Sequence, residues 1–463
     1  MKTLARKIVV GLFLIILLPC NGNFTQARSS RDPDSSSQIA LGEADHPWRS
    51  EYVLRSIVPP IDMGKFSSLV INPVDNRVYI GFYNYHEGEL MYAYQSPDAN
   101  CGSNNNWHCM QLTNSNDNVG LYASSDIWSQ GDIWKLGISF YDLTHRSLKL
   151  MLETCFGTVC SYKFSTIDSP NDSTMYIGLH SSFKFYQDGI PILSYQILDS
   201  DGSDALMFAH GLPDDYGNCG EDLDAGFWQC DRVDSAEGIG QFASMDVSWN
   251  DNIYIAYHDP GSASLKYAMY HGPYGNCGDG NFWECTTVDD PVGATVGLYA
   301  SMKAPPVEGA PIRIAYYDAT NGHLKFFNSG AGITMVVDDM SISDAHRGIS
   351  LDIDNDNLAV IAYQKIFDQV TPPVLSVARP YLAFDDGFYG NCGDVIAGNQ
   401  YWRCNTIDYG AENILVGEFV SLAINSHGLA RIAYTEEDQV NFTTGLKFIY
   451  QVNQTFLPLI TKR

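Results

Sequence analysis

A short run of carboxylates in this chain has the residue types to bind a metal ion. Asp199, Asp201 and Asp204 lie two and three residues apart around Gly202, a spacing typical of loops that bind calcium through oxygen. The run lacks the glutamate that gives a complete calcium loop its bidentate ligand, so a solvated acidic turn is the alternative. Calcium is therefore the candidate cofactor that the sequence offers.

Candidate catalytic residues are harder to assign. The chain contains no HExxH, GxSxG, phosphate-binding loop or dinucleotide-binding GxGxxG motif, each of which would mark a known kind of active site. A glycoside hydrolase needs only two carboxylates about 5–10 Å apart, but among 54 acidic residues such pairs arise by chance. The sequence therefore assigns no catalytic residue.

The charge and the N-terminus indicate an exported, acidic protein. Acidic residues outnumber Lys and Arg by 54 to 27, which argues against nucleic acid or an anionic membrane as a partner. Lys and Arg residues precede an apolar run, Ile8–Leu18, that is too short to span a membrane, and this order is typical of a secretory signal peptide. We predict a signal peptide over residues 1–22, a polar linker over 23–44 and no transmembrane segment in the mature chain. Pro19 argues against a lipid anchor at Cys20.

Ten cysteines fall into five close pairs, and four of the pairs share one context. In those four, an Asn-Cys-Gly segment precedes a tryptophan, and the second cysteine follows the tryptophan by two residues. The pairs lie too far from one another for a zinc-binding motif, whereas paired cysteines in an exported chain form disulfides. We predict five local disulfides, each worth about 2–3 kcal/mol: Cys101–Cys109, Cys155–Cys160, Cys219–Cys230, Cys277–Cys285 and Cys392–Cys404.

The cysteine pattern belongs to a longer repeat. A Gly-x-x-x-Ser segment occurs in six of seven units, and the sixth unit carries a degenerate copy that ends at Ser350 with His346 in place of the glycine. Each copy precedes a small-aromatic pair in an apolar run (Ala256-Tyr257, for example), a third alternating run such as LKYAM, and a fourth run. In five copies the fourth run ends at an aspartate: Asp168, Asp234, Asp289, Asp338 or Asp408. Four short runs separated by turns predict four strands. Seven such units predict an all-β, seven-bladed β-propeller with four-stranded antiparallel blades over residues 45–451.

The two ends of the repeat indicate how the ring closes. The seventh unit contains three strands, and Trp48 stands five residues before Val53, as in the other fourth strands. We expect residues 46–58 to supply the missing strand, which removes an exposed sheet edge. Residues 452–463 are then a C-terminal tail containing FLPLITKR, whose role the sequence leaves open.

The repeat also places a candidate binding surface. The first strand of each propeller blade lines the central channel, and the residue two positions before each serine should lie at the channel mouth. Six of these residues are aromatic: Phe66, Tyr122, His180, Phe242, Tyr299 and Phe419. A strand start and the loops at the same face add Arg347, His145, Arg146, His258, Asp259, Asp318 and His323. Aromatic faces beside carboxylates and cations suit sugar rings, and packing between blades is the alternative.

Charged residues follow a second register inside the channel. Two positions after each serine the series reads Val70, Asp126, Lys184, Asp246, Lys303, Asp352 and Ala423. Opposite charges at equivalent positions of successive blades predict ion pairs in the channel, for which we expect a structural role.

The units resemble those of a known group of propellers. The segments IRIAYYDATNGHLKF and IYIAYHDPGSASLKYAM look like repeats of secreted bacterial propellers grouped with the sialidase-like superfamily, marked by BNR or Asp-box repeats. The resemblance covers roughly residues 46–451 and implies the fold more strongly than an activity. Enzymes of that superfamily carry Asp boxes, an arginine triad and a Tyr–Glu pair, whereas this chain has no intact Asp box. Fucose-binding lectin propellers resemble it in repeat layout.

Together these features predict a secreted, non-catalytic recognition module that binds carbohydrate or a cell-surface protein at the channel mouth. An exo-acting, sialidase-like glycoside hydrolase at the same face is one alternative, and a structural scaffold without a small ligand is another. Resemblance of fold does not by itself transfer function.

Overall fold

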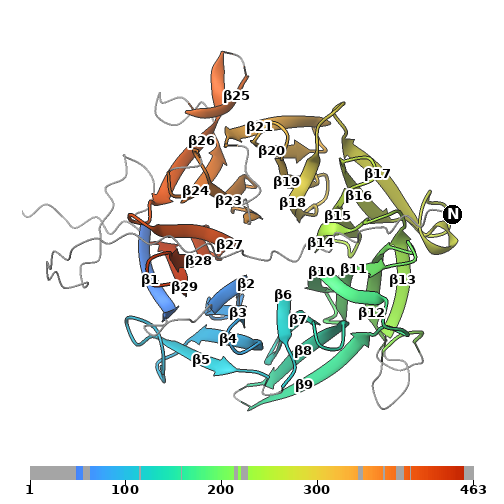
Figure 1. The fold of residues 1–463 in the computed structure, drawn as a ribbon, viewed down its shortest axis with the longest axis horizontal. Coiled ribbons are helices and arrows are strands. Elements are labelled where there is room, and N and C mark those ends of the chain that lie inside the picture. The colour runs from blue at the N-terminus through green and yellow to red at the C-terminus, as the bar shows by residue number, and fades with distance from the viewer. Residues whose placement is uncertain are drawn as a thin grey trace, which may run out of the picture. The chain divides into compact units, whose positions relative to one another are not determined.

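The computed structural model confirms the predicted all-β propeller. It describes residues 48–55, 63–113, 116–157, 159–212, 217–220, 228–341, 348–368, 371–381, 390–396 and 398–452. Within these ranges seven antiparallel sheets follow one another around a central axis (Figure 1). The predicted signal peptide, the predicted linker and residues 453–463 of the predicted tail lie outside the described residues. A search of the described residues finds no helix with the length and apolarity needed to cross a membrane.

Blades 1 to 5 are each built from four consecutive strands, ordered from the channel outward. Blade 1 contains β2 (Met63–Ile71), β3 (Val78–Asn84), β4 (Glu89–Gln95) and β5 (Trp107–Gln111). Blade 2 contains β6 (Val119–Gln130), β7 (Ile133–Asp142), β8 (Ser147–Phe156) and β9 (Val159–Asp168). Blade 3 contains β10 (Met175–Phe185), β11 (Pro191–Asp199), β12 (Ala205–Gly211) and β13 (Trp228–Asp234). Blade 4 contains β14 (Gln241–Val247), β15 (Ile253–Asp259), β16 (Ser264–Tyr270) and β17 (Trp283–Asp289), with the short 3-10 turn η1 (Asp279–Asn281) before β17. Blade 5 contains β18 (Val296–Lys303), β19 (Arg313–Asp318), β20 (His323–Asn328) and β21 (Ile333–Asp339).

Blade 6 departs from the four-strand expectation. It contains β22 (Ile349–Ile353), β23 (Ala359–Lys365), β24 (Val374–Pro380) and β26 (Asn399–Asp408), with the additional strand β25 (Cys392–Ile396) at its outer edge. The additional strand forms because the cysteine loop of this blade folds back as a hairpin, in which Ile396 pairs with Asn399.

Blade 7 joins the two ends of the described chain. It contains β27 (Ile414–Ile424), β28 (Ala430–Asp438), β29 (Thr443–Gln451) and, as its outer strand, β1 (Trp48–Arg55). β1 runs antiparallel to β29 with Trp48 opposite Gln451, in agreement with the predicted closure. The N-terminal strand therefore completes the last sheet.

The apolar core lies between neighbouring blades. Tyr254 and Leu265 of blade 4, for example, pack in one cluster with Val296, Met302 and Ile314 of blade 5. Because each sheet is covered by a neighbour on both faces, the second strands are mostly buried, and β3, β15 and β19 are buried along their whole length. The first strands lie next to the central axis and line its cavities.

Candidate functional site

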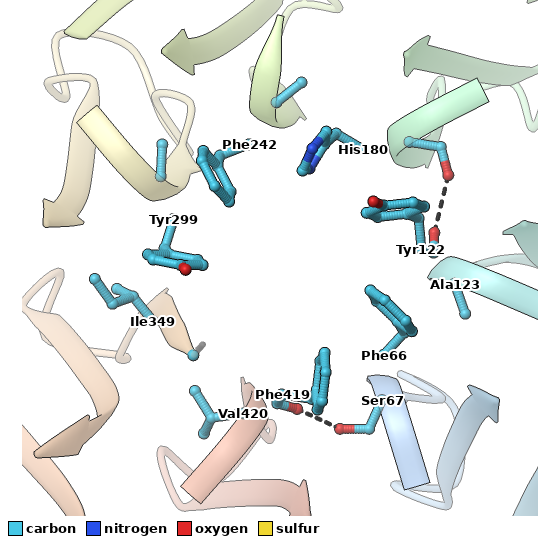
Figure 2. Close-up of a pocket in the computed structure, with 14 residues that line it drawn as sticks. Phe66, Ser67, Tyr122, Ala123, His180, Phe242, Tyr299, Ile349, Phe419 and Val420 are labelled. Atoms are coloured by element: carbon cyan, nitrogen blue, oxygen red, sulfur yellow. Dashed lines mark hydrogen bonds between the residues drawn. The ribbon is translucent and has the colours of Figure 1, made fainter. Parts of the chain in front are cut away.

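Six aromatic side chains from six first strands surround the mouth of the channel. They line an open cavity of about 220 Å³ and point toward its centre (Figure 2). Neighbouring rings lie 4.5–4.9 Å apart between centroids and are tilted by 51–59°. We name this ring the aromatic collar, and its members are Phe66, Tyr122, His180, Phe242, Tyr299 and Phe419. The fold thus brings together all six aromatic residues predicted from the repeat.

The backbone of every collar residue lies in the left-handed region. The φ angles of the six residues fall between 49° and 54°, where side chains other than glycine are rarely found. The cause is an irregularity in the first strand: in blade 5 the register jumps from Leu298 opposite Tyr317 to Ser301 opposite Ala315, so that Tyr299 lies in a bulge. A bulge redirects a side chain that a regular strand would send to a sheet face, and here it directs the ring to the channel axis.

The glycine of the Gly-x-x-x-Ser motif allows close contact between blades. Gly297 has a φ of +90°, and a Cβ atom added there would lie 2.9 Å from the Cα atom of Leu265 in the preceding blade. A side chain at this position would push the bulged strand away from its neighbour. The glycine therefore fixes where the bulge begins.

The serine of the motif joins each blade to the next. Ser244 Oγ, for example, accepts a hydrogen bond at 3.1 Å from the backbone N–H of Met302. The same contact recurs at all seven blade boundaries and closes a ring of hydrogen bonds beneath the collar. The most regular residue of the repeat thus has a structural role.

Blade 6 interrupts the collar. Gly348 occupies the position of the aromatic residue, and β22 pairs with β23 without a register shift. The collar therefore has a gap between Tyr299 and Phe419. Arg347, predicted to lie at this strand start, is outside the described residues.

Two ionisable side chains of the collar, His180 and Tyr122, have pKa values shifted toward their neutral forms. Burial lowers the pKa of His180 to about 4 and raises the pKa of Tyr122 above its ordinary value. Both are therefore uncharged near pH 7. The other described lining residues are small or aliphatic, such as Ala123 and Val420, so the collar offers ring faces, an imidazole and hydroxyl groups to a ligand.

The chain is a seven-bladed β-propeller. Compared with known protein families and with curated proteins, it matches none. Among solved structures it is similar to an α-L-arabinanase from Penicillium chrysogenum complexed with arabinobiose, with 12% identity and a TM-score of 0.45 over 71% of this chain and 98% of that chain. An α-L-arabinofuranosidase from Fusarium graminearum has 11% identity and a TM-score of 0.43 over 72% and 98%. A sialidase from Streptococcus pneumoniae has 11% identity and a TM-score of 0.40 over 86% and 70%. Similarities this low carry no argument about the site.

The predicted residues His145, Arg146 and His258 do not line the collar cavity, and each contacts its own loop or the next blade. His145 Nδ1 lies 2.9 Å from the carboxylate of Asp142, three residues earlier. The Arg146 guanidinium lies 4.8 Å from the centroid of a tyrosine ring in the next blade. His258 is buried and donates a hydrogen bond at 2.8 Å to the Val296 carbonyl oxygen, and burial lowers its pKa. These contacts fix loops around the collar.

The predicted acidic loop residues stabilise turns. Asp259 accepts hydrogen bonds from the backbone N–H groups two and three residues later, and Asp318 does the same. His323 Nε2 lies 3.3 Å from the carboxylate of Asp339 across the β20–β21 pair. These side chains lie at the collar face because the second-to-third-strand loops do, but they do not line the collar cavity.

The carboxylates considered for calcium accept backbone hydrogen bonds. Asp204 accepts from the N–H groups of Asp199 at 2.7 Å and Gly238 at 2.6 Å, and Asp201 accepts from Ser203 at 2.8 Å. These bonds account for an acidic turn between β11 and β12. Calcium binding by Asp199, Asp201 and Asp204 stays a prediction.

The predicted ion pairs inside the channel are present. Lys184 Nζ lies 3.7 Å from a carboxylate oxygen of Asp126 and 3.7 Å from one of Asp246. Lys303 Nζ lies 3.0 Å from Asp352. The alternation of charge in the sequence thus becomes an alternation around the channel wall.

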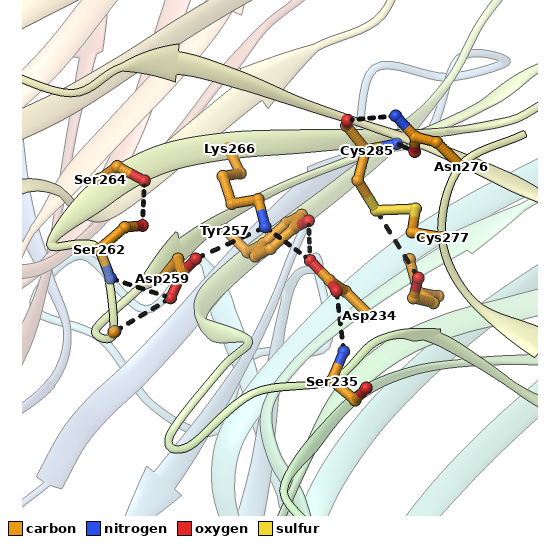
Figure 3. Close-up of polar contacts among 12 residues, drawn as sticks. Asp234, Ser235, Tyr257, Asp259, Ser262, Ser264, Lys266, Asn276, Cys277 and Cys285 are labelled. Carbon is orange, nitrogen blue, oxygen red and sulfur yellow. Dashed lines mark hydrogen bonds and ion pairs between the residues drawn. A yellow bond between two sulfur atoms is a disulfide. The ribbon is translucent and has the colours of Figure 1, made fainter.

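The sequence did not predict one repeated set of contacts between blades (Figure 3). The hydroxyl group of Tyr257 in blade 4 donates at 2.7 Å to Asp234 at the end of blade 3, and Lys266 Nζ lies 2.9 Å from the same oxygen. Tyrosine–aspartate bonds of this kind join five blade boundaries: Asp168–Tyr195, Asp234–Tyr257, Asp289–Tyr316, Asp338–Tyr363 and Asp408–Tyr434. Both the aspartate and the aromatic residue recur in the sequence. Their pairing was not predicted because it joins the last strand of one repeat to the second strand of the next.

All five predicted disulfides are present. In blade 4 the Asn276 side chain both donates to and accepts from the backbone of Cys285 (Figure 3). Asp279 of the same loop accepts a hydrogen bond from the backbone N–H of Arg232 in blade 3. The disulfide loop therefore attaches one blade to the outer strand of the preceding blade.

Proposed function

We propose that this protein is a secreted, non-catalytic recognition module whose aromatic collar binds carbohydrate. The observation that carries the proposal is the collar itself, six aromatic side chains held in the left-handed backbone region around one open cavity. Five disulfides fit an extracellular protein. Glycans are available as partners in the extracellular space.

The backbone strain supports a role for the collar beyond filling space. A residue other than glycine in this region costs on the order of 1–3 kcal/mol, whereas glycine adopts the same backbone freely. In blade 6, Gly348 stands at this position without a positive φ, and the first strand pairs regularly from Ile349 onward, so a blade of this protein can do without the ring and its left-handed backbone. Six blades nevertheless have an aromatic residue in the left-handed region at this position. Contact between these rings and a ligand would explain why the strain is retained.

The size and chemistry of the cavity favour one sugar unit. Ring faces stack on the apolar C–H face of a sugar, while the imidazole and hydroxyl groups form hydrogen bonds. The volume of about 220 Å³ is below the range of about 300–1,000 Å³ usual for drug-sized ligands. We therefore expect a terminal sugar to enter the collar, rather than an internal segment of a chain.

Loops at the same face extend the surface around the collar. Tyr85, Phe367 and Phe442 have exposed side chains on the loops between second and third strands. Lys65 lies over the ring of Tyr85, 4.7 Å from its centroid. These groups could contact the rest of a glycan, or a cell-surface protein that carries it.

The test is incubation of the purified chain, without residues 1–22, with a mixed oligosaccharide library, followed by mass spectrometry of the free pool. We expect selective depletion of a few oligosaccharides without new masses. Phe242→Ala should abolish the depletion, whereas Tyr274→Ala, which removes an exposed aromatic residue outside the collar, should not. New product masses would reveal a glycoside hydrolase. An unchanged pool would reject carbohydrate as the ligand and leave a protein partner or a scaffold role.

A further inference from the structure

The channel beneath the serine ring holds a second, larger cavity. Its volume is about 390 Å³, and residues from all seven first strands line it. None of these residues lines the collar cavity. Asp126, Lys184, Lys303 and Asp352 are among the lining residues, and their side chains are 17–25% exposed. Charged groups therefore face a solvent-accessible space rather than a closed core.

The three acids of the channel are rigidly placed. One carboxylate oxygen of each accepts a hydrogen bond from a backbone N–H of the next blade: Asp126 from Phe185 at 2.9 Å, Asp246 from Ala304 at 2.9 Å, and Asp352 from Ile424 at 2.7 Å. The other oxygen is the one that faces a lysine. Because backbone N–H groups hold the three carboxylates in place, binding of a cation would not require these side chains to move.

The ring of alternating charge is incomplete on one side. Blades 2 to 6 contribute acid, lysine, acid, lysine and acid, but blades 7 and 1 contribute Ala423 and Val70. The two terminal acids, Asp126 and Asp352, therefore each have a lysine on one side and a small apolar residue on the other. Three carboxylates against two ammonium groups leave one negative charge in excess.

The three carboxylates of the channel act together on Lys303. Burial by itself would lower the pKa of this amine, but the carboxylates of Asp352, Asp246 and Asp126 outweigh it and raise the pKa above its ordinary value. At the position of Lys303 the carboxylates therefore outweigh the cost of burying a positive charge. The excess of acidic residues in the whole chain, 54 against 27 Lys and Arg, acts in the same direction.

We propose that the channel binds a small organic cation, an amine whose ammonium group lies on the side of blades 7 and 1 and completes the alternating ring. Ala423 and Val70 line the cavity there without a charge, and the neighbouring lining residues Ile71, Pro73 and Ile424 offer apolar contacts to the body of the ligand. This site is separate from the collar, and the proposal does not depend on carbohydrate binding.

The test is isothermal titration of the purified chain with n-butylamine, n-butanol and butyrate, which share a body and differ in charge. We expect n-butylamine to bind at least tenfold more tightly than the other two. The double variant Asp126→Asn/Asp352→Asn should weaken amine binding at least tenfold. Glu412→Gln, which removes an acid from an exposed turn outside every candidate site, should leave it unchanged. Equal binding of butanol, an absence of amine binding, or full binding by the double variant would overturn the proposal.

A second variant covers the case in which the double variant does not fold. Ala423→Lys places a covalently attached ammonium group in the gap, next to Asp352. It should raise the melting temperature and abolish binding of n-butylamine. A folded Ala423→Lys protein that binds the amine as tightly as the parent would equally overturn the proposal. Neither variant touches the collar, so oligosaccharide depletion should persist in both, and loss of one activity can be told from loss of the other.

Discussion

Backbone strain in the collar can be measured directly at Phe242. The φ angle of this residue is 54°, and its ring centroid lies 4.9 Å from that of His180 and 4.5 Å from that of Tyr299. Replacing Phe242 with alanine removes both ring contacts and keeps a side chain in the left-handed region. Replacing it with glycine removes the same contacts and relieves the strain. The difference in stability between the two variants therefore isolates the backbone.

The expected magnitudes give this difference a definite sign. Each lost ring contact is worth about 0.5–1.5 kcal/mol, so both variants should be less stable than the parent by roughly 1–3 kcal/mol. The left-handed backbone costs an L-residue roughly 1–2 kcal/mol, and Phe242→Gly should therefore be more stable than Phe242→Ala by about 1 kcal/mol. In a regular strand the order is reversed, with glycine about 0.5–1 kcal/mol less stable than alanine.

The assay is thermal unfolding followed by circular dichroism, with Tyr267 as the control position. Tyr267 lies in the regular part of β16, so its alanine variant should be the more stable of the two there. For a propeller of this size, about 1 kcal/mol corresponds to roughly 1 °C in melting temperature. If Phe242→Ala proved as stable as Phe242→Gly, the strain argument would be wrong, and packing between blades would explain the collar.

Two further predictions concern buried charge. Lys184→Ala should lower the melting temperature, because two carboxylates lose the ammonium group that lies 3.7 Å from each. We expect a cost on the order of 1–3 kcal/mol, below that of a fully buried pair, and an unchanged melting temperature would contradict it. Met207→Lys should stabilise the protein at pH 7, because Met207 occupies the position that Lys266 has in blade 4, close to Asp168. Burial raises the pKa of Asp168, so its ionised form gains most from a nearby amine. That gain should disappear as the pH falls into the acid range and the carboxyl group is protonated, and a gain that persists after protonation would refute the reasoning.

The sequence by itself was sufficient for everything that depends on local spacing. Strands and turns follow from alternating runs of a few residues, and the cysteines of each disulfide lie within a dozen residues of one another. Ring closure by the N-terminal strand could also be predicted, because Trp48 has the same position in its strand as the tryptophans of other outer strands. Even the membership of the collar followed from the repeat, since equivalent residues of equivalent strands must meet at one axis.

Tertiary structure decided what these residues contact. In a propeller the contacts between blades join residues about one repeat apart, so the Asp234–Tyr257 bond crosses a boundary that alignment of repeats keeps separate. The direction of a side chain in a turn depends on local hydrogen bonds, which is why Asp259 faces its own backbone and not the collar. The bulge that turns Tyr299 inward, and the regular pairing of blade 6 from Ile349 onward, are likewise properties of strand register. Spacing therefore predicted which residues approach the channel, whereas the closed ring determined their orientation and their charge partners.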